Sequence, residues 1–234
     1  MNNNFPDLIN CEIIKRTSGL STTLLCDGMN DLNLSVGGCM FPSIKAIDSS
    51  MKVIGTVVTV ETSEGNNFPI HLATYQIPAE GYVMVIDGKG YNDRAYFGDL
   101  IMGAAQTSGY LGMIVDGYTR DYIGNIKLEF PVFSRGLMAK GPIKANCGII
   151  NGDIICGGVH VRPGDLVMGD SDGVCVVPRE YIENVLEKAE QKQVYEGKRL
   201  EVIELYRKAK NDGTILPQIT PQWVLDMLSD ENNV

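Results

Sequence analysis

Hydrophobic and polar positions follow two different periods along the chain, and together they predict a fold that mixes helices with strands. Residues 7–36 carry apolar side chains at helical spacing, and Ser21 is a typical N-cap for the second half of this stretch. Residues 52–60 and 82–87 are continuous apolar runs rich in β-branched side chains, which is typical of buried strands. Glycine-rich segments separate these runs and predict turns between them.

The rest of the sequence predicts a mixture of helices and strands up to about residue 145, then only strands, and finally helices. We expect short helices at 69–76 and 100–108, strands at 113–117 and from 130, short strands across 146–177, a long helix at 179–211 and a short amphipathic helix at 221–228. This order predicts a single α/β domain over residues 1–211, in which helices flank a central β layer, followed by a helical tail over 212–234.

The composition and charge of the chain limit the classes of partner that we expect it to bind. The chain has 234 residues, of which 44% are hydrophobic and 21% charged, with a formal net charge of −9. An acidic surface argues against binding to nucleic acid or to anionic membranes, although a local basic pocket for a small anion remains compatible with it. There is no apolar run of membrane-spanning length and no secretory signal, so we expect a cytoplasmic protein.

The six cysteines are scattered, without a CxxC pair or a Cys/His cluster. They are Cys11, Cys26, Cys39, Cys147, Cys156 and Cys175. Their apolar or glycine-rich surroundings predict reduced, mostly buried thiols, and their spacing argues against structural zinc.

Two short segments could form an anion-binding site. Gly98-Asp99 opens the helix predicted at 100–108, and the free backbone N–H groups of a helix start bind carboxylates and phosphates. Arg120-Asp121 follows the strand predicted at 113–117, where open α/β sheets often bind ligands. Arginine donates planar hydrogen bonds to an oxyanion, and aspartate binds hard divalent ions. Taken alone, the first segment also fits a simple turn with an N-cap, and the second a surface ion pair.

The remaining polar residues give weaker indications. Asn67 and His71 lie four positions apart, so one helical turn would direct them to the same side, either into a pocket or to the surface. Asp165, Asp170 and Asp172 lack the order of a calcium-binding loop and fit turns between short strands better.

The spacing of the two anion-binding segments resembles a known family. Asp99 is followed by twenty residues and then by Arg120-Asp121, and the block from Pro163 to Pro178 is also similar. On these residues the chain resembles, over about 10–205, the class II 4-hydroxy-4-methyl-2-oxoglutarate aldolases. Members of that family are also labelled regulator of ribonuclease activity A-like or demethylmenaquinone methyltransferase-like. The resemblance implies an α/β fold with a sandwich- or barrel-like β layer, similar to swivelling phosphohistidine domains.

The resemblance also implies a role for each site residue. Asp121 would bind Mg²⁺ or Mn²⁺, Asp99 would hold a metal-bound water, and Arg120 would stabilise the enolate. The carboxylate of a pyruvate-like 2-oxo acid would bind at Gly98, Leu100 and Ile101. The pocket would be lined by Asn67, His71 and Lys144, with Lys140 as the alternative lysine. Glu196, in the long helix, would reach a neighbouring subunit's site, which implies a trimer or a hexamer.

One position departs from the family pattern. After Asp121 and two further residues, the family's aldolases carry an acid, and this chain has Gly124 there. Glu129 is a candidate to compensate for the missing acid. Loss of that acid favours oxaloacetate decarboxylation over aldolase activity. Two alternatives stay open: a non-catalytic regulator of a ribonuclease, and an enzyme for a different acid substrate.

Overall fold

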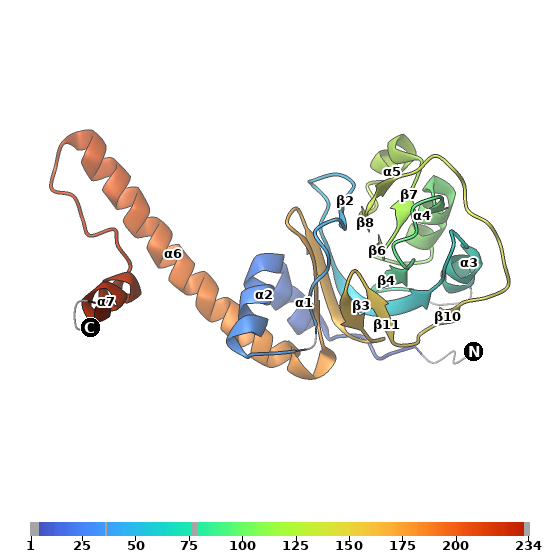
Figure 1. Ribbon diagram of the computed structural model, residues 1–234, viewed down its shortest axis with the longest axis horizontal. Coiled ribbons are helices and arrows are strands. Elements are labelled where there is room, and N and C mark those ends of the chain that lie inside the picture. Colours follow the sequence, from blue (N-terminus) through green and yellow to red (C-terminus); the bar gives the residue numbers. More distant parts are fainter. Residues whose placement is uncertain (1–4, 36, 76–78, 232–234) are drawn as a thin grey trace. The chain divides into compact units, whose positions relative to one another are not determined.

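The computed structural model describes residues 5–35, 37–75 and 79–231, and the chain divides into two compact units, Met1–Ala189 and Glu190–Val234 (Figure 1). Helix α6 (Ile182–Asp212) begins in the first unit and continues into the second, which also contains α7 (Gln222–Glu231). The boundary predicted at residue 211 therefore coincides with the end of α6 and not with the division between the units.

A mixed sheet forms the centre of the first unit. Strands β3, β4, β6 and β8 are parallel, and the outer strands join them antiparallel. In spatial order the described residues give β1 (Gly38–Cys39), β14 (Gly173–Val177), β13 (Leu166–Asp170), β3 (Val53–Glu61), β4 (Tyr82–Asp87), β6 (Gly112–Val115), β8 (Val132–Ser134) and β2 (Lys45–Ala46), with β10 (Ile149–Ile150) also paired to β3.

Helices and a hairpin cover this sheet, as the apolar patterns predict. One core lies between the sheet and α3 (Phe68–Tyr75) and α4 (Asp99–Thr107), and it includes fully buried side chains such as Met102. In another core, α1 (Cys11–Ser18), α2 (Thr22–Asp31) and the first turns of α6 pack against β13 and β14. A third core is closed by the hairpin of β11 (Ile154–Cys156) and β12 (Val159–Val161). The predicted α/β architecture with a central β layer flanked by helices is confirmed.

The local signals for helix and turn positions hold in detail. The side chain of Ser21 caps α2 by accepting a hydrogen bond from the backbone N–H of Leu24 at 3.3 Å. Asp165 accepts hydrogen bonds from the backbone N–H groups of Arg162 and Arg179, which is the turn role predicted for it. No helix in the described part of the chain is long and apolar enough to cross a membrane.

The prediction for the cysteines was wrong in two respects. Cys26 and Cys39 form a disulfide, and Cys11 and Cys147 are exposed. The pairing arises because α2 packs against the edge strand β1, a contact that the sequence separation of 13 does not reveal. Among the described free cysteines, Cys156 and Cys175 are buried, and burial raises the pKa of both thiols.

The second unit carries many exposed apolar side chains. Leu200, Leu205, Trp223 and Met227 are each more than half exposed. Within this unit the guanidinium of Arg199 donates a hydrogen bond to the carbonyl oxygen of Ile219 at 2.5 Å, which ties α6 to the segment before α7.

Candidate functional site

A small parallel sheet brings the two predicted segments together. It consists of β5 (Ala95–Phe97), β7 (Tyr118–Thr119) and β9 (Gly136–Leu137), separate from the main sheet. The backbone N–H of Arg120 donates to the carbonyl oxygen of Phe97 at 3.1 Å, so the chain stays paired where the strands end. Because β5 and β7 are parallel, the residues that follow them emerge side by side, and this explains how a twenty-residue separation produces one site.

Gly98 is required at the contact between the two segments. It is the N-cap of α4, and a Cβ atom built on it would collide with Oδ2 of Asp121 and lie 3.0 Å from the Cγ atoms of Asp121 and Arg120. The carboxylate of Asp121 therefore lies directly against the backbone of Gly98, and only glycine leaves this space free.

The backbone of Asp121 is also unusual. Its φ of 60° and ψ of 45° place it in the left-handed region, which is uncommon for a residue with a side chain. Asp121 is the N-cap of α5 (Tyr122–Leu128), yet its carboxylate makes no capping hydrogen bond within the described structure. Such strained residues cluster at functional sites. The carboxylate does not cap its own helix, and its ion-pair partner is Arg120, with Nε 3.2 Å from Oδ2 of Asp121.

A cavity of about 390 Å³ opens at this contact. It is lined by Asn67, His71, Tyr75, Phe97, Gly98, Leu100, Ile101, Arg120, Asp121, Gly141, Pro142 and Lys144. Two buried polar atoms of these residues, Oδ1 of Asn67 and Nε of Arg120, have no hydrogen-bond partner among the described residues. Buried polar atoms are nearly always hydrogen-bonded, so a polar ligand or an ordered water in this cavity would satisfy both atoms.

Arg120 is held in place by steric contacts more than by hydrogen bonds. Its Nε atom lies 3.2 Å from Oδ2 of Asp121, without hydrogen-bond geometry. A Cβ atom on Gly141 would lie 2.6 Å from Nη1 of Arg120, so the guanidinium passes close over that glycine. The side chains of Arg120 and Asp121 are 40% and 39% exposed, which leaves donor and acceptor groups available to a ligand.

The first turn of α4 offers two backbone donors. The N–H groups of Ile101 and Met102 both donate to the carbonyl oxygen of Gly98. The free N–H groups of this turn, within the described structure, are therefore those of Asp99 and Leu100. The side chain of Ile101 lines the cavity, although its N–H group is engaged.

His71, Tyr75 and Lys144 form another part of the lining. The rings of His71 and Tyr75 stack with their centroids 5.8 Å apart. Burial and the positive charge of Lys144 lower the pKa of His71, which keeps its imidazole neutral at neutral pH. The alternative lysine, Lys140, pairs instead with Asp93 at 2.5 Å, so the structure selects Lys144 as the pocket lysine.

Asn66 organises this part of the cavity, and the sequence patterns did not identify it. Its Oδ1 atom accepts hydrogen bonds from the backbone N–H groups of Phe68 and Ala145, and its Nδ2 atom donates to the carbonyl oxygen of Cys147. Asn66 thereby fixes the loop that carries Lys144 to the start of α3. The interaction joins segments about eighty residues apart, and nothing local distinguishes Asn66 from its neighbour Asn67.

Asp99 does not line the candidate cavity with its side chain. It lies in an adjoining hollow of about 350 Å³ with Gly124 and Lys127. A Cβ atom on Gly124 would collide with Oδ2 of Asp99 and lie 2.7 Å from its Cβ. The carboxylate of Asp99 therefore fills the space beside Gly124, where the family's aldolases carry an acid.

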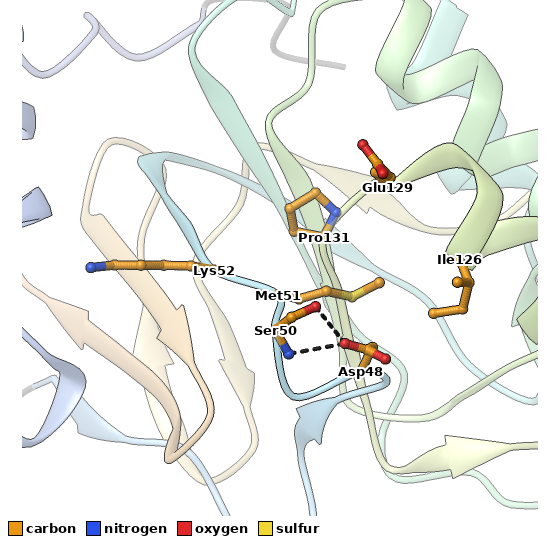
Figure 2. A pocket seen from close by; sticks show the side chains of 7 residues that line it. All are labelled: Asp48, Ser50, Met51, Lys52, Ile126, Glu129 and Pro131. Carbon is orange, nitrogen blue, oxygen red and sulfur yellow. Dashed lines mark hydrogen bonds between the residues drawn. The ribbon is translucent and has the colours of Figure 1, made fainter.

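Glu129 does not replace that acid. It lines a different hollow, of about 440 Å³, together with Asp48, Ser50 and Lys52 (Figure 2). Asp48 accepts two hydrogen bonds from Ser50, and Lys52 extends away from it to donate to backbone carbonyl oxygens. Asp48, Ser50 and Lys52 already have partners, so this hollow is the weaker candidate for a ligand site.

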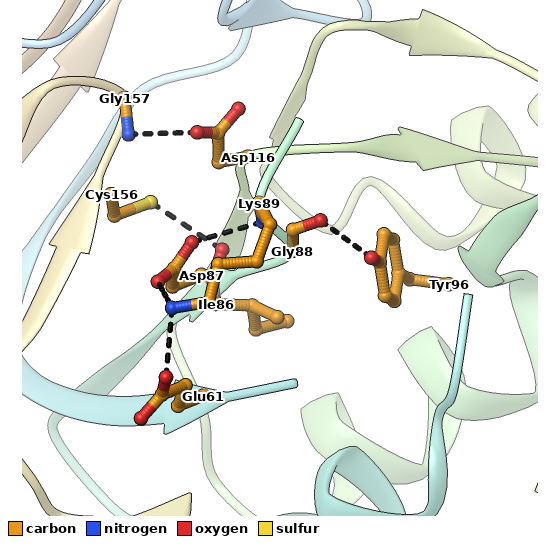
Figure 3. A network of polar contacts seen from close by, with 9 residues as sticks. All are labelled: Glu61, Ile86, Asp87, Gly88, Lys89, Tyr96, Asp116, Cys156 and Gly157. Carbon is orange, nitrogen blue, oxygen red and sulfur yellow. Dashed lines mark hydrogen bonds and ion pairs between the residues drawn. The ribbon is translucent and has the colours of Figure 1, made fainter. Parts of the chain in front are cut away.

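The carboxyl ends of the main parallel strands, where α/β sheets often bind ligands, are closed by a polar network (Figure 3). Lys89 bridges Glu61 at 2.7 Å and the buried Asp87 at 2.5 Å. Asp116 pairs with Arg135 and accepts from the backbone N–H of Gly157, while Cys156 donates to the carbonyl oxygen of Ile86. Since these groups satisfy one another, the small sheet is the stronger candidate for a ligand site.

Glu196 lies in the second unit, in the middle of α6. Its predicted role in a neighbouring subunit's site stays a prediction, and so do the individual roles predicted for the other site residues.

Comparison with known proteins gives consistent matches. The family model described as "RraA-like: Aldolase/RraA" matches residues 22–176. A Halalkalibacterium halodurans protein named "Putative 4-hydroxy-4-methyl-2-oxoglutarate aldolase" is 40% identical over 183 residues, which is 78% of this chain and 84% of the relative.

Solved structures with the same fold are more distant in sequence. The Streptomyces coelicolor protein RraAS2, described as an unusual member of the RNase ES inhibitor RraA family, superimposes with a TM-score of 0.71 at 23% identity, over 83% of this chain and 96% of that one. The RNA-processing inhibitor RraA from Thermus thermophilis matches with a TM-score of 0.58 at 22% identity, over 65% and 92%. At these identities the likeness shows the fold alone.

Proposed function

The chain belongs to the RraA-like family, and from the geometry of its site we propose that it is a divalent-metal-dependent carbon–carbon lyase. Its substrate would be a 2-oxo acid, cleaved through a pyruvate enolate as in oxaloacetate decarboxylation or 4-hydroxy-4-methyl-2-oxoglutarate cleavage. The name of the 40% identical relative supports the reaction class. The observation that carries the proposal is the contact of the Asp121 carboxylate with Gly98, where Asp121 makes no capping hydrogen bond and is ion-paired with the Nε atom of Arg120 at 3.2 Å.

The residues present fit a hard divalent cation. Asp121 offers a carboxylate that neither caps its helix nor makes a hydrogen bond to Arg120, and oxygen ligands are those that Mg²⁺ and Mn²⁺ prefer. Among the described residues, Asp121 belongs to no cluster of three or more carboxylate, histidine or cysteine ligands, and the side chain of Asp99 lies in the neighbouring hollow. This suits Mg²⁺, which is commonly held by one or two carboxylates and keeps several waters. A bound Mg²⁺ or Mn²⁺ would act as a Lewis acid towards the 2-oxo group.

The protein's own groups would bind and orient the substrate. The free N–H groups of Asp99 and Leu100 at the start of α4 would donate hydrogen bonds to the 1-carboxylate, helped by the helix dipole. Arg120 would donate hydrogen bonds to the 2-oxo oxygen and stabilise the negative charge that develops there as the C3–C4 bond breaks. Lys144 would supply a positive charge for the substrate's second carboxylate, and the neutral His71 with Tyr75 would form the wall beside it.

The position of Asp99 favours decarboxylation over retro-aldol cleavage. Loss of carbon dioxide needs no base, because the leaving group departs without a proton transfer. Retro-aldol cleavage needs a base for the C4 hydroxyl group. Asp99 is the nearest acid in sequence to the cavity-lining turn, but its side chain lies in the neighbouring hollow against Gly124. We therefore expect oxaloacetate to be the better of the two substrates.

Assembly is part of the proposal. If Glu196 serves a neighbouring subunit's site, the active form is an oligomer, and we propose a trimer or a hexamer in the cytoplasm. Light scattering should then give a mass that is a multiple of three chains, and Glu196→Gln should lower activity without changing that mass. A fully active monomer would contradict this assignment.

The decisive experiment is a pyruvate-release assay with oxaloacetate and 4-hydroxy-4-methyl-2-oxoglutarate side by side, with and without Mg²⁺. Asp121→Asn should abolish the Mg²⁺-stimulated release above the enzyme-free rate. Lys144→Ala should raise KM, because one carboxylate contact is lost. Lys140→Ala is the matched control: it removes a lysine four positions away that pairs with Asp93 outside the cavity, and it should leave both parameters unchanged.

Unchanged turnover in Asp121→Asn would overturn the lyase proposal. The alternative to test would then be that the chain is a regulator of a ribonuclease. The test would measure whether the chain inhibits a ribonuclease and whether Asp121→Asn leaves that inhibition intact. A substrate panel of other 2-oxo and 2-hydroxy dicarboxylates would separate a different acid substrate from both.

A further inference from the structure

Three cysteines from three separate elements meet in the first unit. Cys26 lies on α2, Cys39 on the edge strand β1 and Cys175 on β14. Their sulfur atoms all lie within 4.8 Å of one another, with Cys26 and Cys39 joined in the disulfide and the sulfurs of Cys26 and Cys175 3.5 Å apart. None of them lines the candidate cavity, so the cluster is independent of the proposed lyase site.

The convergence follows from the fold. β1 pairs with β14 so that Cys39 and Cys175 are direct cross-strand partners, and α2 packs over the same two strands. The three side chains differ in access, because Cys39 is exposed, Cys26 is half-buried and Cys175 is fully buried. The cluster thus has a floor and an opening to solvent.

The ligand set indicates which kind of ion would suit it. With a metal–sulfur distance of about 2.3 Å, three sulfurs arranged trigonally around one ion would be about 4 Å apart. The sulfurs of Cys26 and Cys175 are already 3.5 Å apart, so reduction of the disulfide leaves only the sulfur of Cys39 to move away from Cys26. No histidine or carboxylate among the described residues joins the three sulfurs. Structural zinc sites take four protein ligands, whereas Cu⁺ is a soft ion that prefers thiolates and accepts three.

We propose that Cys26, Cys39 and Cys175 in their reduced form bind one Cu⁺ ion, and that the Cys26–Cys39 disulfide closes this site. A dithiol reductant would open it: the two reductant sulfurs become a disulfide, and their two electrons and two protons convert Cys26 and Cys39 to thiols. Cu⁺ then replaces thiol protons, which pass to solvent, and no further change of oxidation state is needed.

The backbone before Cys39 is open at Gly38 and closely packed at Gly37. A Cβ atom on Gly38 would meet nothing within 4 Å, whereas one on Gly37 would lie 2.6 Å from Cδ of Pro178 and 2.7 Å from the carbonyl oxygen of Val176. β1 comprises only two residues at the edge of the sheet, so a small shift of Cys39 disturbs little pairing. The exposed sulfur can therefore move from disulfide to ligand geometry while Cys175 stays fixed in the core.

The test uses the full chain with Cys11→Ser and Cys147→Ser, which removes the two exposed thiols outside the cluster. The protein is reduced with a dithiol, freed of reductant without oxygen, and titrated with Cu⁺ against a chromophoric Cu⁺ chelator. We expect one tightly bound Cu⁺ per chain and, by X-ray absorption, three sulfur neighbours. Adding Cys39→Ser should weaken binding by about 100-fold or more.

Each other outcome counts against the site. Equal Cu⁺ binding by the oxidised chain, or by the chain with Cys39→Ser, would show that the cluster is a disulfide only. Tighter uptake of Zn²⁺ than of Cu⁺ would overturn the three-sulfur assignment. Because Cys39 is exposed, its serine variant should fold, and unchanged Mg²⁺-dependent pyruvate release by that variant would confirm this independently. The result of the Cu⁺ titration does not depend on whether the chain is a lyase.

Discussion

Replacing Gly98 with alanine would place a methyl group in the space that the carboxylate of Asp121 occupies. The new Cβ would collide with Oδ2 of Asp121 and lie 3.0 Å from its Cγ, compared with an optimal separation of about 3.5–4.0 Å. The backbone at Gly98, with φ −143° and ψ −165°, is extended and suits alanine, so the strain falls on the side chain of Asp121. The carboxylate must move by about 1 Å or more to clear the new methyl group, and misplacement on that scale costs on the order of 100-fold in rate.

The same helix provides a matched control. Gly103 lies in the interior of α4, and a Cβ atom there would make only ordinary contacts at 3.8 Å with the methyl groups of Leu128. Gly103→Ala should raise the free energy of unfolding by about 0.5–1 kcal/mol, because alanine favours the helix. Gly98→Ala should lower it by no more than about 1 kcal/mol, since glycine is only a moderate N-cap. Thermal unfolding measures both changes, and pyruvate release from oxaloacetate measures activity.

The expected result is a roughly 100-fold loss of Mg²⁺-stimulated activity in Gly98→Ala, with a melting temperature within a few degrees of the parent. Gly103→Ala should melt higher and keep full activity. Wild-type activity in Gly98→Ala would refute the argument that the Asp121 carboxylate must sit against this glycine. A large loss of stability in Gly98→Ala would refute the assignment of the strain to the site.

Three further predictions concern other parts of the first unit. Gly124→Ala should lower the free energy of unfolding by about 1–3 kcal/mol in thermal melts, because its Cβ would lie 2.7 Å from the Cβ of Asp99, although alanine normally stabilises a helix. Because the pKa of His71 is lowered in the folded chain, the unfolded chain takes up the proton first as pH falls through about 6.5, and the free energy of unfolding decreases. Above that pH the group contributes nothing to the pH dependence of stability. His71→Gln should remove this loss at acid pH, measured by thermal melts between about pH 5 and pH 8. Cys39→Ser should cost about 3 kcal/mol under non-reducing conditions, from the loop that the disulfide closes over a separation of 13 residues, and should melt like the parent in a dithiol reductant.

The secondary structure could be predicted from the sequence because its signals are local. The run from Tyr82 to Asp87 is buried along its whole length, and such continuous β-branched runs are typical of central parallel strands. Ser21 caps α2 through an interaction that spans three residues. The spacing of Gly98-Asp99 and Arg120-Asp121 pointed to one site, although only the pairing of β5 with β7 shows why they meet.

The features that the sequence did not predict depend on contacts between distant segments. Asn66 fixes a loop about eighty residues away, and the cysteine cluster joins residues from three elements. The predicted strand ended at residue 117, and no strand was predicted over residues 118–119, but in the structure these residues form a strand of a separate small sheet. Hydrophobic periodicity describes which face of an element is buried, and it contains no information about which element lies opposite.

Gly124 illustrates how the structure changes the meaning of a sequence difference. The sequence alone indicates a missing acid, and restoring it by Gly124→Asp would then be expected to restore aldolase activity. In the structure the space beside Gly124 is filled by the carboxylate of Asp99, so a side chain at 124 must first displace Asp99. A displaced Asp99 would turn towards the adjoining cavity, which Leu100 also lines. The carboxylates of Asp99 and Asp121 would then lie in one region, and their repulsion would raise the pKa of one of them. An acid introduced at position 124 would therefore change the position and the charge of Asp99, so we expect Gly124→Asp not to restore aldolase activity by itself.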